Sequence, residues 1–408
     1  MQGKPPINPL LFPVLLVNFI GALGFSIVLP FLVIIVLKLG GNAIVYGLLG
    51  ATYSLFQLIG APVLGARSDR YGRRKILLVS MGGTVVAWII FLIGLLIPDT
   101  HIHFSFESGL VVSVPLILIF LARAMDGITG GNISVANAYL ADISSKSDRK
   151  QNFGKMSAAA NLGLIFGPLL AGLLGATAWG NILPVIATIF ISLSAIFVIF
   201  FQLKDPPARQ STTSPSLGFF AALKLPYVPI FLFLYFLIFL AFNFFYAAFP
   251  VYVAGKLHWS VLQLGVFFAV LSGLLVLVQG PLLAFCASRF SGAALVISGT
   301  LLLGIGFVLF TYTGNVIIYT GVVFFALGNG LMWPSFIGLL STLGSEQTQG
   351  AIQGFASSAG SLASIIGLVT GAVLYHSLGA HVFFLTSILL LIIAIISIKL
   401  IRIEREVS

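Results

Sequence analysis

Long apolar runs, separated by short polar or glycine-containing stretches, dominate this sequence of 408 residues. A helix that crosses the hydrocarbon core of a bilayer needs about 20 such residues, so the chain has room for about twelve spans. Only 7% of its residues are charged, whereas a typical soluble domain has about 25%. A transmembrane β-barrel would alternate apolar and polar residues over segments of about ten, and that alternation is absent. The sequence therefore predicts an all-α membrane protein.

The apolar runs predict twelve transmembrane helices in two sets of six. The first set is expected at residues 10–37, 44–66, 75–97, 112–141, 152–177 and 181–203. The second set is expected at 228–254, 261–287, 292–312, 315–343, 351–376 and 380–401. A Pro-, Ser- and Thr-rich segment between them is typical of a solvated linker. We therefore expect an N-terminal six-helix bundle at 1–203, a cytoplasmic linker at 204–227 and a C-terminal six-helix bundle at 228–408.

Positively charged side chains lie almost entirely in the predicted loops. If the N-terminus is cytoplasmic, 17 of the 20 Lys and Arg residues fall on that side, and Lys38 and Lys256 on the other. Cytoplasmic loops of membrane proteins carry such an excess, so we expect both termini in the cytoplasm. The same distribution accounts for the net charge of +10 without a nucleic-acid partner. The single cysteine, Cys286, excludes an internal disulfide.

The segment that joins spans 2 and 3, residues 62–75, reads PVLGARSDRYGRRK. Gly65 and Gly72 permit a tight turn and close contact between helices. Asp69 stands among five basic residues, where it can accept charge-assisted hydrogen bonds or face a helix N-terminus. A basic loop that only sets topology is the alternative, but the spacing of the glycines, acid and bases favours a specific contact.

Span 4 contains two ionisable residues, Arg123 and Asp126, in the segment RAMDGITGG at 123–131. A charge at the centre of a bilayer costs about 2.5–3.5 kcal/mol on insertion scales, so such residues usually face a cavity and carry function. A spacing of three places both side chains on one helical face, close enough to pair. A neutralised pair with a purely structural role is the alternative.

Three stretches together resemble the major facilitator superfamily, and within it the drug/proton antiporter branch. They are the loop at 62–75, the segment 123–131 with YLADI at 139–143, and GLIFGPLLAG at 163–172. The chain is most similar to the tetracycline/proton exporters of that branch. The resemblance implies two pseudo-symmetric six-helix bundles and alternating access, with the substrate site where the halves meet. A faint internal repeat agrees, since PVLG at 62–65 is echoed by PLLA at 281–284.

The resemblance also implies roles for individual residues. Asp69 would contact the N-terminus of span 11 and Asp142 would engage Arg73, which would latch the halves at the cytoplasmic side. The implied gating residues are Gly65, Asp69, Arg70, Gly72, Arg73 and Asp142. The implied helix-interface signature in span 5 is Gly163, Gly167, Pro168 and Gly172. Ordinary packing of small residues, and for Asp142 a simple charge at a helix end, are the alternatives.

Polar and aromatic side chains within the spans are candidates for the wall of a substrate cavity. They are Asn18, Tyr53, Gln57, Asn132 and Asn161 in the first half, and Asn243, Tyr246, Tyr252, Gln279, Asn329 and Trp333 in the second. Span 7 is especially aromatic, which suits an amphiphilic or aromatic ligand through stacking and apolar burial. For any single aromatic residue, packing inside the bundle is the alternative.

Proton coupling is assigned to Asp126 together with Arg123. Asp126 is the carboxylate that the sequence places well inside a span, and Asn18 stands where the tetracycline exporters have an acidic residue on span 1. Burial favours the neutral acid at Asp126, whereas a neighbouring arginine favours the carboxylate. A change in this balance between two states would allow the site to take up and release a proton.

The leading hypothesis is a secondary active transporter that exports a small amphiphilic compound, multidrug or tetracycline-like, in exchange for protons. A lipid, sugar or metabolite carrier on the same fold is the alternative, followed by an integral-membrane enzyme or a non-transporting scaffold. We find no P-loop, no catalytic arrangement and no metal-ligand spacing, so neither an enzyme nor a cofactor is expected. The expected partners are a small-molecule substrate, protons and the lipid bilayer, with a monomer in the bacterial inner membrane.

Overall fold

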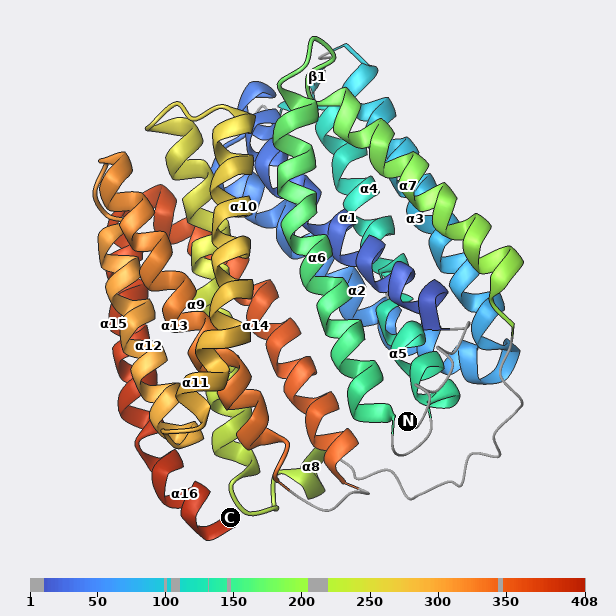
Figure 1. Ribbon diagram of the computed structural model, residues 1–408. Coiled ribbons are helices and arrows are strands. Elements are labelled where there is room, and N and C mark those ends of the chain that lie inside the picture. Colours follow the sequence, from blue (N-terminus) through green and yellow to red (C-terminus); the bar gives the residue numbers. More distant parts are fainter. Residues whose placement is uncertain are drawn as a thin grey trace. The chain divides into compact units, whose positions relative to one another are not determined.

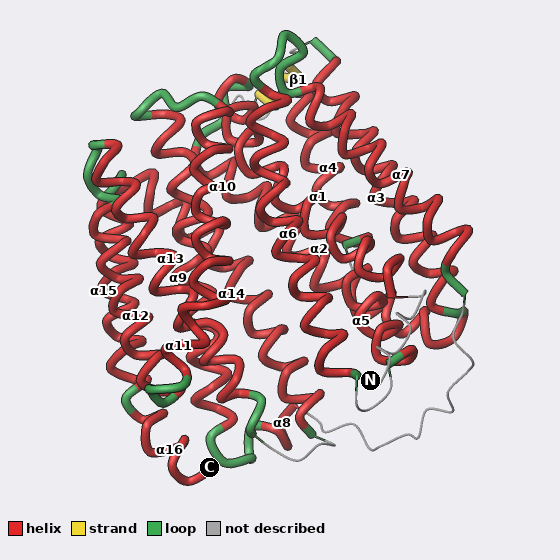
Figure 2. Tube along the Cα trace, viewed as in Figure 1, coloured by secondary structure: helices red, strands yellow, loops and turns green. Residues whose placement is uncertain are grey.

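A computed structural model describes residues 11–98, 101–103, 111–130, 132–144, 148–204, 219–343 and 348–407. Within these residues, twelve helical segments are long and apolar enough to cross a membrane. Figures 1 and 2 show that helices make up almost all of the described chain. The predicted all-α membrane fold with twelve spans is therefore confirmed.

The chain divides into two compact units. The first comprises Met1–Gly40, Thr52–Gln210 and Ser260–Val266, and the second comprises Gly41–Ala51, Ser211–Trp259 and Phe267–Ser408. In this division, 41–51 groups with the second unit and 260–266 with the first, and the predicted domain boundaries stay a prediction. Residues 205–218, most of the predicted linker, lie outside the described residues.

The helices and strands of the first half are named along the chain as in Figure 1. They are α1 (Leu11–Lys38), α2 (Ala43–Tyr71), α3 (Arg73–Leu96), β1 (His101–His103), β2 (Val111–Ser113), α4 (Val114–Thr129), α5 (Asn132–Ile143), α6 (Arg149–Gly175) and α7 (Ile182–Gln202). The two strands pair antiparallel, with Ile102 opposite Val112.

The second half begins with a short helix inside the predicted linker and ends with a polar helix. Its elements are α8 (Phe219–Ala222), α9 (Val228–Gly255), α10 (Val261–Leu277), the π-helix η1 (Val278–Leu282), α11 (Leu283–Ala287), α12 (Gly292–Leu309), α13 (Asn315–Leu340), α14 (Gln349–Leu378), α15 (His381–Ser397) and α16 (Lys399–Val407).

Span 8, which the sequence predicts as one regular α-helix, contains a turn of a different helix type. Span 4 is described as α4, which ends at Thr129, and α5, which begins at Asn132, and residue 131 between them lies outside the described residues. Span 8 contains the π-helical turn η1 around Pro281, because proline lacks the backbone N–H that continues an α-helix. Single π-helical turns of this kind often mark functional sites.

Glycines of the span 5 signature bring α6 directly against α1 in the first unit. A Cβ atom added at Gly163 would lie 2.8 Å from the Leu23 backbone nitrogen, and one added at Gly167 would lie 2.9 Å from the Ile27 nitrogen. At this crossing the Ser26 hydroxyl donates a hydrogen bond to the Gly163 carbonyl over 3.0 Å. Gly163 and Gly167 therefore serve a close helix crossing within the unit, whereas Gly172 faces Leu262 and Gly265 of the α10 segment that groups with this unit.

Aromatic side chains fill the core of the second unit. Phe245 and Phe249 of α9 are fully buried and stack with ring centroids 4.9 Å apart. Phe249 also stacks on Phe267 of α10 at 4.3 Å, and Tyr252 is buried with its hydroxyl bonded to the Tyr312 carbonyl. Much of the aromatic character of span 7 therefore serves packing inside this unit.

Helix α16 caps the N-terminus of α12 through a carboxylate. Glu404 accepts hydrogen bonds from the backbone nitrogens of Gly292, over 2.7 Å, and Ala293, over 2.9 Å. These two N–H groups have no partner inside α12, and a negative charge is favourable at that end of a helix.

Replacing this cap tests the contribution of α16 to stability. Glu404→Ala removes two charge-assisted hydrogen bonds, so we expect the free energy of unfolding to fall by about 1–2 kcal/mol. Arg405→Ala, at an exposed neighbour, is the control and should leave stability unchanged. Thermal unfolding in detergent measures both variants, and equal melting temperatures would contradict the capping role.

Candidate functional site

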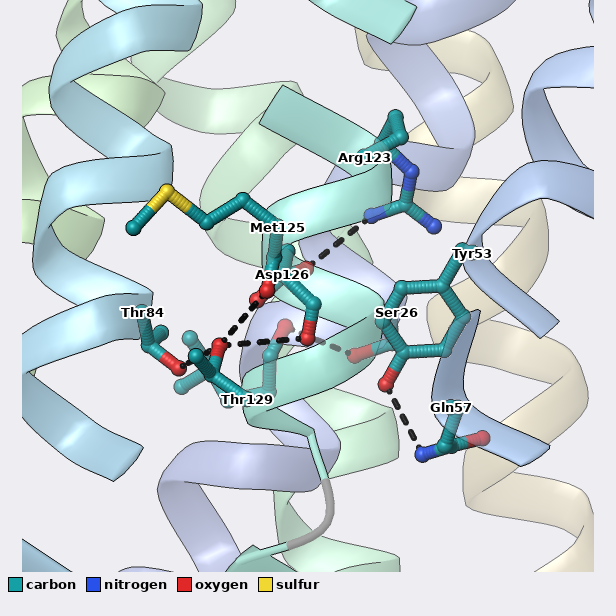
Figure 3. A network of polar contacts seen from close by, with 9 residues as sticks. Ser26, Tyr53, Gln57, Thr84, Arg123, Met125, Asp126 and Thr129 are labelled. Atoms are coloured by element: carbon teal, nitrogen blue, oxygen red, sulfur yellow. Dashed lines mark hydrogen bonds and ion pairs between the residues drawn. The ribbon is translucent and has the colours of Figure 1, made fainter. Parts of the chain in front are cut away.

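The centre of the candidate site is an ion pair inside the first unit (Figure 3). Arg123 Nη1 lies 3.2 Å from Asp126 Oδ2, as the spacing of three on α4 predicts. The two side chains are only 5% and 13% exposed. The Gly130 backbone nitrogen donates a hydrogen bond to the Asp126 carbonyl over 2.7 Å, so the helical turn after Asp126 is complete.

Tyr53 of α2 covers the guanidinium group of this pair. The Arg123 carbon Cζ lies 4.4 Å from the centre of the Tyr53 ring, which is a cation–π contact. Gln57, one turn further along α2, donates a hydrogen bond to the Tyr53 hydroxyl over 3.1 Å. The arginine is thus held by a carboxylate on its own helix and by an aromatic ring from a neighbouring helix (Figure 3).

Small residues allow the close approach of α2 and α4 that places Tyr53. A Cβ atom added at Gly127 would lie 2.5 Å from the Tyr53 carbonyl oxygen and 2.9 Å from the Phe56 Cβ atom. A Cβ added at Gly60 of α2 would clash in the same way with the backbone of Ile128. Glycine is therefore required on both helices at this crossing.

Hydroxyl groups fix the end of α4 against α3. Ser80 donates a hydrogen bond to the Thr129 carbonyl over 2.5 Å, and the hydroxyls of Thr84 and Thr129 lie 3.0 Å apart. Thr129 also bonds back to the Met125 carbonyl over 3.0 Å. Figure 3 shows the contacts of Thr129 with Thr84 and Met125 beside Asp126, so the carboxylate stands on a helix end that is anchored to its neighbour.

The loop between α2 and α3 carries a second ion-pair network, centred on Arg73. Arg73 Nε lies 3.0 Å from Asp142 Oδ2 of α5, the pairing that the resemblance implies. Its Nη2 lies 2.5 Å from Asp69, whose side chain is 66% exposed, and its Nη1 donates to the Ser68 hydroxyl. Gly72 makes the turn possible, because its φ of 96° lies in the region that favours glycine.

The other residues of the predicted gate contribute less to this network. The guanidinium group of Arg70 lies over the ring of Tyr71 at 5.4 Å. Gly65 has room for a Cβ, with the Ser134 hydroxyl 4.0 Å away, although its carbonyl accepts a bond from Ser68. The contact of Asp69 with span 11 would join the two units and stays a prediction.

Two of the predicted cavity residues hold helices together. Asn18 is 4% exposed and donates to the Met156 carbonyl of α6 over 2.7 Å. Asn243 of α9 is 8% exposed and donates to the Ser364 hydroxyl of α14 over 3.0 Å. Both side chains thus fasten helix pairs within their own units.

The remaining cavity candidates lie in different surroundings. Tyr53 and Asn132 line a small cavity next to Asp126. Gln279 lies in the π-helix η1, and the side-chain oxygen of Asn329 is buried without a partner among the described residues. Asn161 of α6 is half-buried, and Tyr246 stacks on Phe268.

Trp333 of α13 belongs to a cluster of aromatic side chains in the second unit that we call the Trp333 cluster. Its ring lies 5.2 Å from Tyr235 and 5.4 Å from Phe239, both on α9, and it stacks on Phe336 at 6.2 Å. Trp333 and Phe239 are only half-buried, unlike the rings in the core of the unit. Part of the aromatic surface of this cluster is therefore not covered by neighbouring side chains.

Sequence reasoning did not identify several polar residues near Asp126. Trp88 and Thr84 of α3 and Ser192 of α7 line the same small cavity. Each occurs in a strongly apolar run, so no local pattern distinguishes it from a packing residue. Their grouping depends on the crossing of α3 with α4 and α7, which the sequence alone does not give.

Comparison with known proteins places the chain among membrane transporters. The family model of the Major Facilitator Superfamily matches residues 14–367 and 231–408. Tetracycline resistance protein, class C, of Escherichia coli is 27% identical over 337 residues, which is 81% of this chain and 80% of that protein. Major facilitator superfamily domain-containing protein 10 of Mus musculus is 25% identical over 370 residues, 84% of this chain and 76% of that protein.

Solved structures share the fold at lower sequence identity. The human organic anion transporter MFSD10 (TETRAN) superposes with a TM-score of 0.69 at 21% identity, covering 97% of this chain and 100% of that chain. The D-xylose-proton symporter has a TM-score of 0.76 at 15% identity, covering 95% and 96%.

Proposed function

The chain belongs to the Major Facilitator Superfamily, and we propose that it exports a small amphiphilic compound in exchange for protons. The family and the twelve apolar helices make it an integral, multi-pass membrane transporter and not an enzyme. The coupling ion, the direction of transport and the substrate class are the proposed part. We also propose the bacterial inner membrane, with both termini in the cytoplasm.

The observation that carries the proton coupling is the buried pair Arg123–Asp126. Among the described residues, Asp126 is the one carboxylate that lies away from the ends of a span. Burial favours its neutral form, and Arg123 at 3.2 Å favours the carboxylate. A movement of either side chain during transport shifts this balance, so the carboxyl can bind a proton in one state and release it in the other.

The contact between α2 and the ion pair supports this role. Tyr53 belongs to α2 and contacts the arginine. A displacement of α2 against α4 therefore changes the surroundings of Arg123 directly and those of Asp126 through the pair.

The proposed substrate class rests on aromatic surface and on relatives. The Trp333 cluster offers half-buried rings suited to stacking on an amphiphile. Several relatives at 25–27% identity are tetracycline resistance proteins. A human relative in fold is an organic anion transporter, so amphiphilic anions belong in the same test. A lipid, sugar or metabolite carrier is the alternative.

Trp333→Ala tests the aromatic contact. We expect substrate affinity to fall about tenfold, which corresponds to about 1.4 kcal/mol, because a stacking surface is lost. Trp179→Ala is the matched control, since Trp179 is 66% exposed and lies outside the cluster. Binding to purified protein measures the effect, and equal affinity in both variants would exclude Trp333 from the substrate site.

A substrate screen tests the proposed function as a whole. Purified protein in liposomes with an imposed pH gradient and an internal pH dye is exposed to amphiphilic cations, anions and zwitterions, and to sugars. We expect an amphiphile to collapse the gradient only when protein is present. A response to sugars or amino acids alone would favour the alternative carrier.

A further inference from the structure

A small polar cavity lies inside the first unit beside Asp126. Its volume is about 20 Å³, and side chains of α1, α2, α3, α4, α5 and α7 line it. Three of its lining residues, Asp126, Thr84 and Tyr53, are visible in Figure 3 on three different helices. The cavity is therefore part of the interior of this helix bundle and directly adjoins the proposed coupling residue.

Three residues that line this cavity each have a buried polar atom without a hydrogen-bond partner among the described residues. The atoms are Nε1 of Trp88, Oδ1 of Asn132 and Oγ of Ser192. The residues are 3%, 3% and 1% exposed, so bulk water does not reach them. Buried polar groups are normally paired, by protein or by ordered water. Three unpaired groups around one cavity therefore indicate a bound molecule that pairs with them.

We propose that this cavity holds one ordered water molecule that hydrogen-bonds the Asp126 carboxyl, Trp88, Asn132 and Ser192. A water needs a cavity of about 10–15 Å³ and two to four polar partners, and this cavity meets both requirements. The lining supplies an indole N–H donor, an amide oxygen acceptor and a hydroxyl that does either. Water both donates and accepts, whereas a cation would face the Trp88 N–H and the charge of Arg123.

A smaller cavity beside the arginine is consistent with local hydration. It measures about 10 Å³ and is lined by Trp88, Phe91, Arg123 and Asp126 among others. The Nε atom of Arg123 has no hydrogen-bond partner among the described residues. The volume is at the lower limit for a water, so the larger cavity carries the proposal.

The water would allow the buried carboxyl to exist in both protonation states. It donates a hydrogen bond to the carboxylate and, after rotation, accepts one from the carboxylic acid. Asp126 then exchanges its proton without losing its polar partners, which a buried group otherwise does at a cost. This inference rests on the proposed proton coupling at Asp126, but the water itself is detectable without transport.

The first test is structural and spectroscopic. A high-resolution structure of the full chain should contain density for a water between these residues. Infrared difference spectra between two pH values should show an O–H stretch that shifts when the solvent is H₂¹⁸O. Neither measurement requires a variant, so poor folding of a mutant leaves the test intact. Absence of both the density and the isotope-sensitive band would overturn the proposal.

Variants of residues that line the cavity test whether the isotope-sensitive O–H band comes from a water in this cavity. Ser192→Ala and Trp88→Phe each remove one partner of the water and should remove or shift the band. Ser397→Ala is the control, because the Ser397 hydroxyl is also buried without a partner in the described part of the chain but lies on α15 of the second unit. A band that is the same in all three variants and the parent protein would place the water elsewhere and refute the assignment.

Transport assays distinguish a failure of the proposed water from a failure of the proposed proton coupling. Trp88→Phe should slow pH-driven export by up to about tenfold, the effect expected from losing the hydrogen bond between the indole N–H and the water. If Asp126→Asn retains uphill export while the parent protein shows the water density and the isotope-sensitive band, proton coupling at Asp126 is wrong and the water stands. If Asp126→Asn abolishes export while the parent protein shows neither the density nor the band, the coupling stands and the water is refuted.

Discussion

Asp126→Asn is expected to abolish accumulation of substrate against its gradient under an imposed pH difference. The amide keeps the shape of the side chain and its place beside Arg123, 3.2 Å away in the parent protein, but it binds no proton in this pH range. Each proton that moves inward supplies about 2.3 kcal/mol per 100 mV, and the variant loses access to this energy. Substrate binding and downhill exchange should persist.

Uphill and downhill flux in the same proteoliposomes measure this variant. Asp148→Asn is the matched control, because it makes the same chemical change at an exposed carboxylate next to α6. Uphill accumulation by Asp126→Asn at matched protein amounts would place the proton site elsewhere. Asp142 would then be the next carboxylate to test.

Asp69→Asn is expected to lower transport strongly while the unfolding free energy stays nearly unchanged. The Asp69 side chain is 66% exposed, and exposed ion pairs contribute at most about 1 kcal/mol to stability. The proposed latch acts on a different quantity, the balance between two transport states. A charge at a helix end contributes about 0.3–1 kcal/mol, or about 2 kcal/mol where it is partly buried, which shifts such an equilibrium about 2- to 30-fold.

Arg73→Ala, unlike Asp69→Asn, is expected to lower both stability and transport. The Arg73 side chain is 15% exposed and is paired with both Asp69 and Asp142. Its loss leaves Asp142 unpaired, so we expect stability to fall by about 1.5–3 kcal/mol together with transport. Lys75→Ala removes an exposed positive charge from the same segment and should change neither quantity. Transport rates and thermal unfolding measure all three variants, and full exchange activity in Asp69→Asn would contradict the latch.

Local sequence patterns predicted the features that depend on one helix. The lengths of the apolar runs gave twelve spans, and the spacing of three gave the Arg123–Asp126 pair. The pairing of Arg73 with Asp142 came from the family resemblance and is present at 3.0 Å. In each case the information lies within a few residues of sequence or in a known motif.

Features that depend on which helices cross could not be predicted in this way. Asn18 and Asn243 are polar residues in apolar spans, a pattern shared by cavity walls and by helix-to-helix hydrogen bonds. Their partners, Met156 and Ser364, are 138 and 121 residues away. The contact of Tyr53 with Arg123 likewise needs the close approach of α2 and α4 at Gly127.

The most direct measurement of the central claim begins with no pH difference. Liposomes that contain the protein receive only a substrate gradient, and an internal dye follows the pH while substrate flux is recorded. Proton exchange predicts that the lumen acidifies as substrate leaves it and becomes alkaline as substrate enters. The Asp126→Asn protein should show neither change. Substrate flux through the parent protein with a constant internal pH would contradict proton-coupled export.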